Sequence, residues 1–289
     1  MHDFDFLEPT SLAEASRMAG DLGEDARFIA GGTALVLTLR QRMLRPSHLI
    51  SLGRLEFLRG IDFNPRDGLR IGALTRHAEV AGHPAVRHAY PMLATMASQL
   101  ANPQVRHQGT LGGNLCYADP ATDPPACLLA LDARVVLGSH RGQRELPLSA
   151  FLVDYFSTAI EPDELLLEVR LPAPPADAVG RYARHRRTAA EHRPLITLGL
   201  MAGLDGGGRC QDLRLSLGGS VAVAQRLPRA EAILNGQPVT AERIRQCALE
   251  ATTEIDPLDD ARGSAAYRRA MVRVQVERTL ADAFGVAVE

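Results

Sequence analysis

The stretch that decides the fold lies near the N-terminus and reads Ile29-Ala30-Gly31-Gly32-Thr33-Ala34-Leu35-Val36. A short apolar strand is expected at residues 28–30, directly before the glycines. An apolar, helix-like stretch follows over residues 34–43, and residues 48–50 have the composition of a second strand. This order predicts a β–loop–α–β unit with a double glycine at the strand-to-helix turn.

A double glycine at such a turn suits the binding of a phosphate group. Main-chain N–H groups can converge on one anion only where no side chain blocks the approach, and glycine removes the Cβ and permits positive φ. A helix that starts just after the turn adds partial positive charge. Thr33 also offers a hydroxyl group. Residues 29–36 are therefore candidate ligands of a phosphate or diphosphate.

A second glycine-rich segment of like composition reads Gly109-Thr110-Leu111-Gly112-Gly113-Asn114. We expect it to be a loop that offers the same main-chain donors again, together with an Asn amide. A double glycine alone is more often only a turn, but two such loops could hold two ends of one ligand. Neither loop is a G-x-G-x-x-G motif with an acidic residue at the ribose position, which disfavours a Rossmann dinucleotide site.

The rest of the chain alternates helical and strand patterns, with a proline-rich linker expected at residues 172–176. The S-x-x-E pattern at Ser11 and Glu14 predicts a capped helix that stops at Gly23. After the linker, strands are followed by helices, which suggests a separate α+β domain. The predicted strands are 69–74, 134–137, 165–171, 195–204 and 213–217, and the predicted helices are 75–101 (broken at Pro84 and Pro91), 126–131, 241–253 and 265–284.

Composition excludes several classes of function. The 289 residues carry a net charge of −2, which argues against a general nucleic-acid binder. All 32 basic residues are arginine, so a lysine Schiff base and a Walker-A phosphate loop are excluded. The four cysteines form no C-x-x-C pair, so we expect neither a zinc site nor an iron–sulfur cluster in this chain. The acidic N-terminus and the lack of an 18-residue apolar run predict a cytoplasmic protein without a membrane span.

These motifs resemble the FAD-binding (medium) subunit of the molybdenum hydroxylases, the xanthine dehydrogenase and carbon monoxide dehydrogenase group. The resemblance covers nearly the whole chain and includes Ala30-Gly31-Gly32-Thr33 and Gly109-Thr110-Leu111-Gly112-Gly113-Asn114. It continues through Ala118-Asp119-Pro120-Ala121-Thr122-Asp123. The combination of G-T-x-G-G-N with A-D-P-x-x-D is highly specific, whereas the motifs of the C-terminal third are weaker.

The resemblance implies an α+β fold in which a PCMH-type FAD-binding domain is followed by a C-terminal domain. Residues 1–172 would form the FAD-binding domain, from two α/β subdomains at about 1–57 and 58–172. Residues 177–289 would form the flavoprotein C-terminal α+β domain, with an antiparallel sheet and helices. The two subdomains would clasp an extended, non-covalently bound FAD.

The resemblance also implies roles for individual residues. Residues 29–36 and 109–114 would hold the diphosphate of FAD and its flanks, and Asp123 matches a family aspartate near the ribityl chain and the flavin ring. Asp123 could instead cap the helix that begins near Ala126. Leu100 and Leu166 fall where the family has apolar contacts to the cofactor, although both also suit the core. The family often has a lysine near the flavin ring, where this chain offers Arg184 or, without a gap, Tyr182.

The function implied by the resemblance is electron transfer by an FAD subunit with no catalytic residue of its own. A small [2Fe-2S] subunit and a large molybdopterin subunit would be its partners, in a dimer of heterotrimers, and an external acceptor would take the electrons. Two alternatives remain open: a stand-alone PCMH-type oxidase, and a non-enzymatic module that binds FAD or another phosphate ligand. The substrate of the complex, the final acceptor and the stoichiometry do not follow from this sequence.

Overall fold

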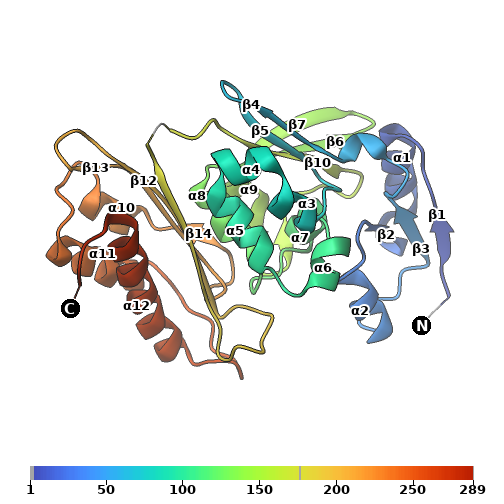
Figure 1. Ribbon diagram of the computed structural model, residues 1–289. Coiled ribbons are helices and arrows are strands. Elements are labelled where there is room, and N and C mark those ends of the chain that lie inside the picture. Colours follow the sequence, from blue (N-terminus) through green and yellow to red (C-terminus); the bar gives the residue numbers. More distant parts are fainter. Residues whose placement is uncertain (1–2, 176, 289) are drawn as a thin grey trace.

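The computed structural model describes residues 3–175 and 177–288, and these form three sheets of three to five strands and one small two-stranded sheet (Figure 1). The first is a small parallel sheet in the order β1-β3-β2. The unit predicted around the first double glycine is confirmed, because β2 leads through that turn and a helix to a parallel neighbour, β3. The elements are β1 (Asp5–Leu7), α1 (Leu12–Leu22), η1 (Gly23–Asp25), β2 (Ala26–Ile29), α2 (Leu35–Arg40), β3 (His48–Ser51) and η2 (Glu56–Leu58).

Helix α1 begins and ends at the residues that its sequence predicts. The Ser11 side chain accepts a hydrogen bond from the N–H of Glu14 at 3.2 Å, and Gly23 follows the helix with a φ of 54°. The Glu14 carboxylate accepts from the N–H of Thr10 rather than from that of Ser11, so the capping box is shifted by one residue. Helix α2 is shorter than predicted, since it ends at Arg40.

The second sheet is antiparallel, in the order β4-β5-β10-β6-β7, and helices cover one side of it (Figure 1). The predicted helix breaks at Pro84 and Pro91 are confirmed, because each proline is the first residue of a new helix. The elements are β4 (Ile61–Asn64), β5 (Gly68–Gly72), α3 (His77–Gly82), α4 (Pro84–Ala89), α5 (Pro91–Gln99), α6 (Pro103–Gln108), α7 (Leu111–Tyr117), α8 (Pro124–Ala130), β6 (Arg134–Ser139), β7 (Gly142–Pro147), α9 (Leu148–Phe151), β8 (Leu152–Asp154), β9 (Ser157–Thr158) and β10 (Leu165–Leu171).

One prediction in this region is wrong: residues 109–114 are not a loop. Helix α7 begins at Leu111, so Gly112 and Gly113 lie in its first turn. Thr110 is the N-cap, and its side chain accepts a hydrogen bond from the N–H of Gly113 at 3.2 Å. The low helix propensity of glycine suggested a loop, but the threonine cap and the packing of this turn hold it helical.

The third sheet is antiparallel, in the order β11-β12-β13-β14, and it carries the C-terminal helices on one face (Figure 1). Helix α8 packs on the opposite face, where the Ser216 hydroxyl donates to the carbonyl of Ala126 at 2.5 Å. The helices predicted at 241–253 and 265–284 are confirmed. The elements are β11 (Val179–His185), β12 (Ile196–Leu204), β13 (Cys210–Gly218), β14 (Gln225–Arg226), α10 (Pro228–Leu234), α11 (Ala241–Thr253) and α12 (Ala265–Phe284).

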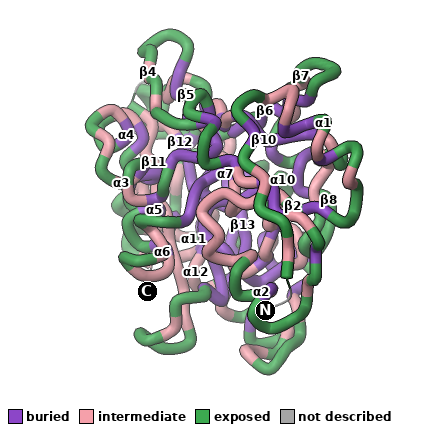
Figure 2. Tube along the Cα trace, turned by 90° about the vertical axis from the view of Figure 1, so that its right-hand side faces the viewer, coloured by how far each residue is buried: buried purple, intermediate pink, exposed green. Residues whose placement is uncertain are grey.

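Two large clusters of buried side chains form most of the core, and Figure 2 colours the buried residues purple. The first lies between the second sheet and its helices, and the second lies between the third sheet and α10–α12. The first cluster also takes in Met201 of β12, from beyond the 172–176 segment. Residues 172–175 belong to no helix or strand, and Ala176 lies outside the described residues. The predicted α+β class with a C-terminal antiparallel sheet is confirmed. Within the described residues, no helix combines the length and the hydropathy that a membrane span needs.

Candidate functional site

The two glycine-rich segments lie against each other, although they are almost 80 positions apart in the sequence. A Cβ at Gly31 would stand 2.1 Å from the carbonyl oxygen of Gln108, so only glycine fits at this contact. A Cβ at Gly109 would lie 3.2 Å from the Thr33 hydroxyl. The first loop therefore rests on the junction between α6 and α7.

The first loop leaves a row of main-chain donors without partners. None of the hydrogen bonds found in residues 3–175 and 177–288 uses the N–H groups of the five residues from Gly31 to Leu35. The next N–H group, that of Val36, donates to the carbonyl of Gly32 at 3.0 Å. These five residues are only half-buried. Such a row of free N–H groups at a glycine turn is a typical anion-binding arrangement.

The second segment uses its main-chain donors inside the protein. The N–H of Leu111 donates to the carbonyl of Thr75 at 3.0 Å, and the N–H of Gly112 donates to the carbonyl of Ala73 at 2.9 Å. The N–H groups of Gly113 and Asn114 bond to the Thr110 hydroxyl and carbonyl, respectively. The expectation of a second set of free main-chain donors is therefore wrong for Leu111 to Asn114, whereas the N–H of Thr110 donates to no described residue. Contact between residues 109–114 and a cofactor stays a prediction.

Gly112 has a packing role that the sequence did not reveal. A Cβ at this position would lie 2.6 Å from the Cβ of Ala73 and 2.8 Å from its carbonyl oxygen. Glycine therefore lets the first turn of α7 approach the end of β5. We had expected glycine here because a diphosphate approaches it, but the close neighbour is the protein's own backbone.

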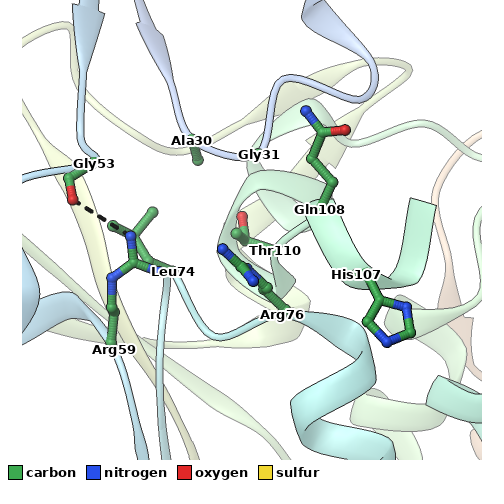
Figure 3. Close-up of a pocket in the computed structure, with 9 residues that line it drawn as sticks. All are labelled: Ala30, Gly31, Gly53, Arg59, Leu74, Arg76, His107, Gln108 and Thr110. Carbon is green, nitrogen blue, oxygen red and sulfur yellow. Dashed lines mark hydrogen bonds between the residues drawn. The ribbon is translucent and has the colours of Figure 1, made fainter. Parts of the chain in front are cut away.

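A cavity of about 180 Å³ opens between the first loop and the α6–α7 junction (Figure 3). Arg59 and Arg76 point into it from opposite the loop, and the guanidinium of Arg59 also donates to the carbonyl of Gly53 at 3.4 Å. The Arg76 guanidinium forms no ion pair or hydrogen bond with any described residue. Neither arginine carries a signal in the sequence that marks it as a site residue. The lining residues are Ala30, Gly31, Gly53, Arg59, Leu74, Arg76, His107, Gln108 and Thr110.

The three polar residues predicted near the flavin ring come together in one buried cluster. The Tyr182 hydroxyl donates to Oδ1 of Asp123 at 2.5 Å, and Nε of Arg184 lies 2.9 Å from the same oxygen. The second contact is ionic, because the Nε–H is not aligned for a hydrogen bond. The structure thus brings both candidates, Tyr182 and Arg184, to Asp123. Asp123 occupies the N-cap position of α8, but its side chain accepts no capping hydrogen bond there. The structure therefore excludes the alternative role as a helix cap.

The cluster is held from several sides and has an unusual electrostatic state. The Arg184 guanidinium also donates to the carbonyls of Gln99, at 2.5 Å, and His192. Burial raises the pKa of Asp123 to about 6, although the charge of Arg184 and the bond from Tyr182 act in the opposite direction. Burial also raises the pKa of Tyr182, and the charge of Asp123 adds to this effect. Asp123 precedes the 172–176 segment, whereas Tyr182 and Arg184 belong to strand β11 after it. The cluster therefore links the two parts of the chain.

The remaining predicted site residues lie in the core. Leu100 is 3% exposed and Leu166 is 4% exposed, and both belong to the large cluster beside the second sheet. Little of either side chain is therefore open to a cofactor. Asn114 lies closer to the polar residues, since its amide donates to the Thr122 hydroxyl at 2.8 Å, next to Asp123. Cofactor contacts of these three residues stay predictions.

Two known protein families match this chain, one before the predicted proline-rich linker and one after it, and both agree with the family that the sequence motifs resemble. Residues 2–174 match the family described as the FAD binding domain in molybdopterin dehydrogenase. Residues 177–283 match the CO dehydrogenase flavoprotein C-terminal domain. The two matches meet at the predicted proline-rich linker.

Individual relatives and solved structures match over nearly their full length. The chain is 37% identical to the 6-hydroxypseudooxynicotine dehydrogenase complex subunit alpha of Paenarthrobacter nicotinovorans, over 97% of this chain and 94% of that protein. It is 31% identical to the carbon monoxide dehydrogenase medium chain of Hydrogenophaga pseudoflava, over 96% of each. A solved carbon monoxide dehydrogenase from that organism superposes with a TM-score of 0.94 at 33% identity, covering 98% of both chains. The chain therefore belongs to the family of FAD-binding medium subunits of the molybdenum hydroxylases, and its homologues are oxidoreductase subunits.

Proposed function

We propose that this chain carries FAD as the electron-transfer subunit of a molybdenum-containing hydroxylase or dehydrogenase. It takes electrons from the [2Fe-2S] clusters of a partner subunit and passes them to an external acceptor. The observation that carries this proposal is the row of five N–H groups from Gly31 to Leu35 that donate to no described residue, beside a cavity that Gly31 lines together with Arg59 and Arg76. Family membership adds the identity of the ligand.

The donor set fits the diphosphate of FAD, which carries two negative charges. Within residues 29–36, the N–H groups of Gly31 to Leu35 would hold it, and the guanidinium groups of Arg59 and Arg76 would face the same charges from across the cavity. Thr110 lines this cavity as well. The second glycine-rich segment would act mainly by supporting the first loop, because all of its N–H groups except that of Thr110 donate to other described residues.

When bound, FAD supplies the ability to accept electrons singly and to release one or two. The protein contributes position, shielding and charge near the ring. We propose that the cluster of Asp123, Tyr182 and Arg184 lies at the ring end of the cofactor site. The carboxylate of Asp123 partly neutralises the charge of Arg184. We therefore expect Arg184→Gln to shift the flavin midpoint potential, but by less than the removal of an unpaired cation at the same place would. An unchanged potential would remove Arg184 from the ring environment.

A direct test begins with the purified protein. We expect a yellow protein that contains one FAD per chain and that releases the flavin into the supernatant on acid precipitation. Flavin that stays with the precipitate would instead favour the stand-alone oxidase, in which FAD is often covalently tethered. A colourless protein that binds no added FAD would contradict the proposal.

The partner part of the proposal needs the complex. We expect the chain to isolate from its source with a small [2Fe-2S] subunit and a large molybdopterin subunit, as a cytoplasmic dimer of heterotrimers. The substrate of the complex should bleach the flavin only when both partners are present. Rapid bleaching of the isolated chain by a substrate would contradict electron transfer through partner subunits.

A further inference from the structure

A patch of exposed apolar side chains lies on α2 and the turn that follows it. Val36 is 37% exposed, Leu37 is 55% exposed and Met43 is 70% exposed, while Leu39 from the same helix is buried. Helix α2 lies at the outer edge of the molecule, away from the C-terminal sheet (Figure 1). Large apolar side chains that gather on an open surface commonly mark an interface.

Three arginines surround this patch without a partner among the described residues. Arg40, Arg42 and Arg45 are exposed, and their guanidinium groups form no hydrogen bond or ion pair with the residues that the structure describes. There is no acidic residue from position 34 to position 46. Most arginines elsewhere in the fold bond to a carboxylate or a carbonyl, as Arg141 does to Asp163 at 2.7 Å. The positive charge beside α2 is therefore uncompensated.

The backbone at Arg42 supports a role outside the chain. Arg42 has a φ of 58°, the left-handed conformation that glycine commonly supplies at the end of a helix. The turn is closed by the N–H of Met43, which donates to the carbonyl of Thr38 at 3.0 Å. A residue with a side chain is strained in this conformation. The arginine side chain gains no contact within the described chain that would offset this strain.

We propose that Val36, Leu37, Arg40, Arg42, Met43 and Arg45 form a docking surface, the α2 surface, for an acidic face of a partner subunit in this protein's complex. An apolar centre with arginine at its edge is the composition of a protein–protein interface, in which methionine and arginine are enriched. The uncompensated charge selects a partner with carboxylates at the matching positions. This inference rests on the proposed function, because that function requires partner subunits.

The test uses the whole FAD-loaded chain and the rest of its own complex, prepared without the flavoprotein. The variant is Arg40→Glu/Arg42→Glu/Arg45→Glu. The matched control is Arg17→Glu/Arg66→Glu/Arg87→Glu, which makes the same change in net charge at three exposed arginines that also lack partners among the described residues. We expect the first variant to weaken association at least tenfold and the control to change it less than twofold. Raising the salt concentration should narrow this difference.

Arg42→Gly provides a variant that should fold well, since glycine relaxes the left-handed turn. We expect it to keep or raise the Tm of the chain and to weaken association several-fold. Association that is unchanged in both α2 variants, or weakened equally by the control, overturns the inference. A membrane is the alternative occupant of the α2 surface. If the wild type binds phosphatidylserine vesicles, the triple α2 variant does not, and both associate equally well with the rest of the complex, the inference is overturned in favour of a membrane. A wild-type chain that carries FAD but joins no partner overturns the partner part of the proposed function as well.

Discussion

The two glycine-rich segments of this protein are alike in composition and opposite in their hydrogen bonding. Around Gly31 and Gly32, five consecutive N–H groups are free of partners among the described residues. Around Gly112 and Gly113, the N–H groups are bonded to Ala73, Thr75 and the cap at Thr110. Glycine permits close packing in both segments, of Gly31 against Gln108 and of Gly112 against Ala73, but the first segment also leaves main-chain donors free for a ligand. Composition alone does not separate these two uses.

This difference implies that the two segments respond differently to substitution. Changes in the second segment should lower the stability of the protein whether or not FAD is bound. Changes of the side chains that line the cavity beside the first loop should lower the affinity for FAD and leave the stability of the apoprotein nearly unchanged, whereas a Cβ at Gly31 would meet the backbone of Gln108.

The largest effect is expected from Gly112→Val, because the new side chain would meet the backbone of Ala73. We expect the free energy of unfolding of the apoprotein to fall by about 3 kcal/mol, as measured by urea titration. The matched control is Gly206→Val, because no atom lies within 4 Å of a Cβ at that position. A Gly112→Val apoprotein of normal stability that fails only to bind FAD would contradict the packing role.

The next effect is a pH dependence that comes from Asp123. Burial raises its folded pKa to about 6, above the ordinary value of 3.8, so between these values the folded protein holds a proton that the unfolded chain has lost. The contribution of Asp123 to the free energy of unfolding therefore falls by on the order of 2 kcal/mol as the pH rises from about 4 to 6. The Asp123→Asn variant should lose this slope, and Asn replacement of the exposed Asp67 should not. Equal slopes in the wild type and in Asp123→Asn would contradict the prediction.

Arg76→Gln tests the cavity beside the first loop. Loss of one charge-assisted contact to the diphosphate should cost about 1.5 kcal/mol, or roughly tenfold in the Kd for FAD. Because the guanidinium has no partner in the described chain, the Tm of the apoprotein should not change. Arg66→Gln, at an exposed turn, is the control and should leave the Kd unchanged. If both variants bind FAD as the wild type does, Arg76 does not face the diphosphate.

The smallest effect is expected at Thr110. Thr110→Ala removes the side-chain cap of α7 and should destabilise the apoprotein by about 1 kcal/mol. Thr110→Ser keeps the hydroxyl and should restore most of this stability. Thermal unfolding of both variants measures the difference. If alanine and serine are equally stable, the cap contributes nothing and the first turn of α7 depends on Gly112 alone.

Much of the fold could be predicted because local signals agreed with the final packing. Helices α11 and α12 begin at a threonine and a serine cap and carry buried faces, so their bounds follow from sequence. The first turn of α7 could not be predicted, since two glycines suggest a loop and the contact with Ala73 is remote in sequence. The cofactor site divides in the same way: residues 29–36 were indicated by their own pattern, whereas Arg59 and Arg76 carry no local signal.

Asp123 shows the same limit for a single side chain. Its proline neighbours allowed a helix cap, and the family resemblance allowed a place near the flavin ring. The structure shows that no capping bond forms and that its carboxylate meets Tyr182 and Arg184, about 60 positions away. A contact of this range depends on how β11 packs against the FAD-binding part of the chain.

Although it did not indicate strand β11 or helix α10, the sequence by itself determined the family, the β–loop–α–β unit at the first double glycine, and helices α11 and α12. These follow from short-range patterns of capping, periodicity and glycine that act within a few residues. Tertiary structure alone decided which N–H groups stay free for a ligand, which arginines line the cavity, and which partners surround Asp123. The physical reason is that a hydrogen-bond donor is free or used according to its neighbours in space, and these come from distant parts of the chain.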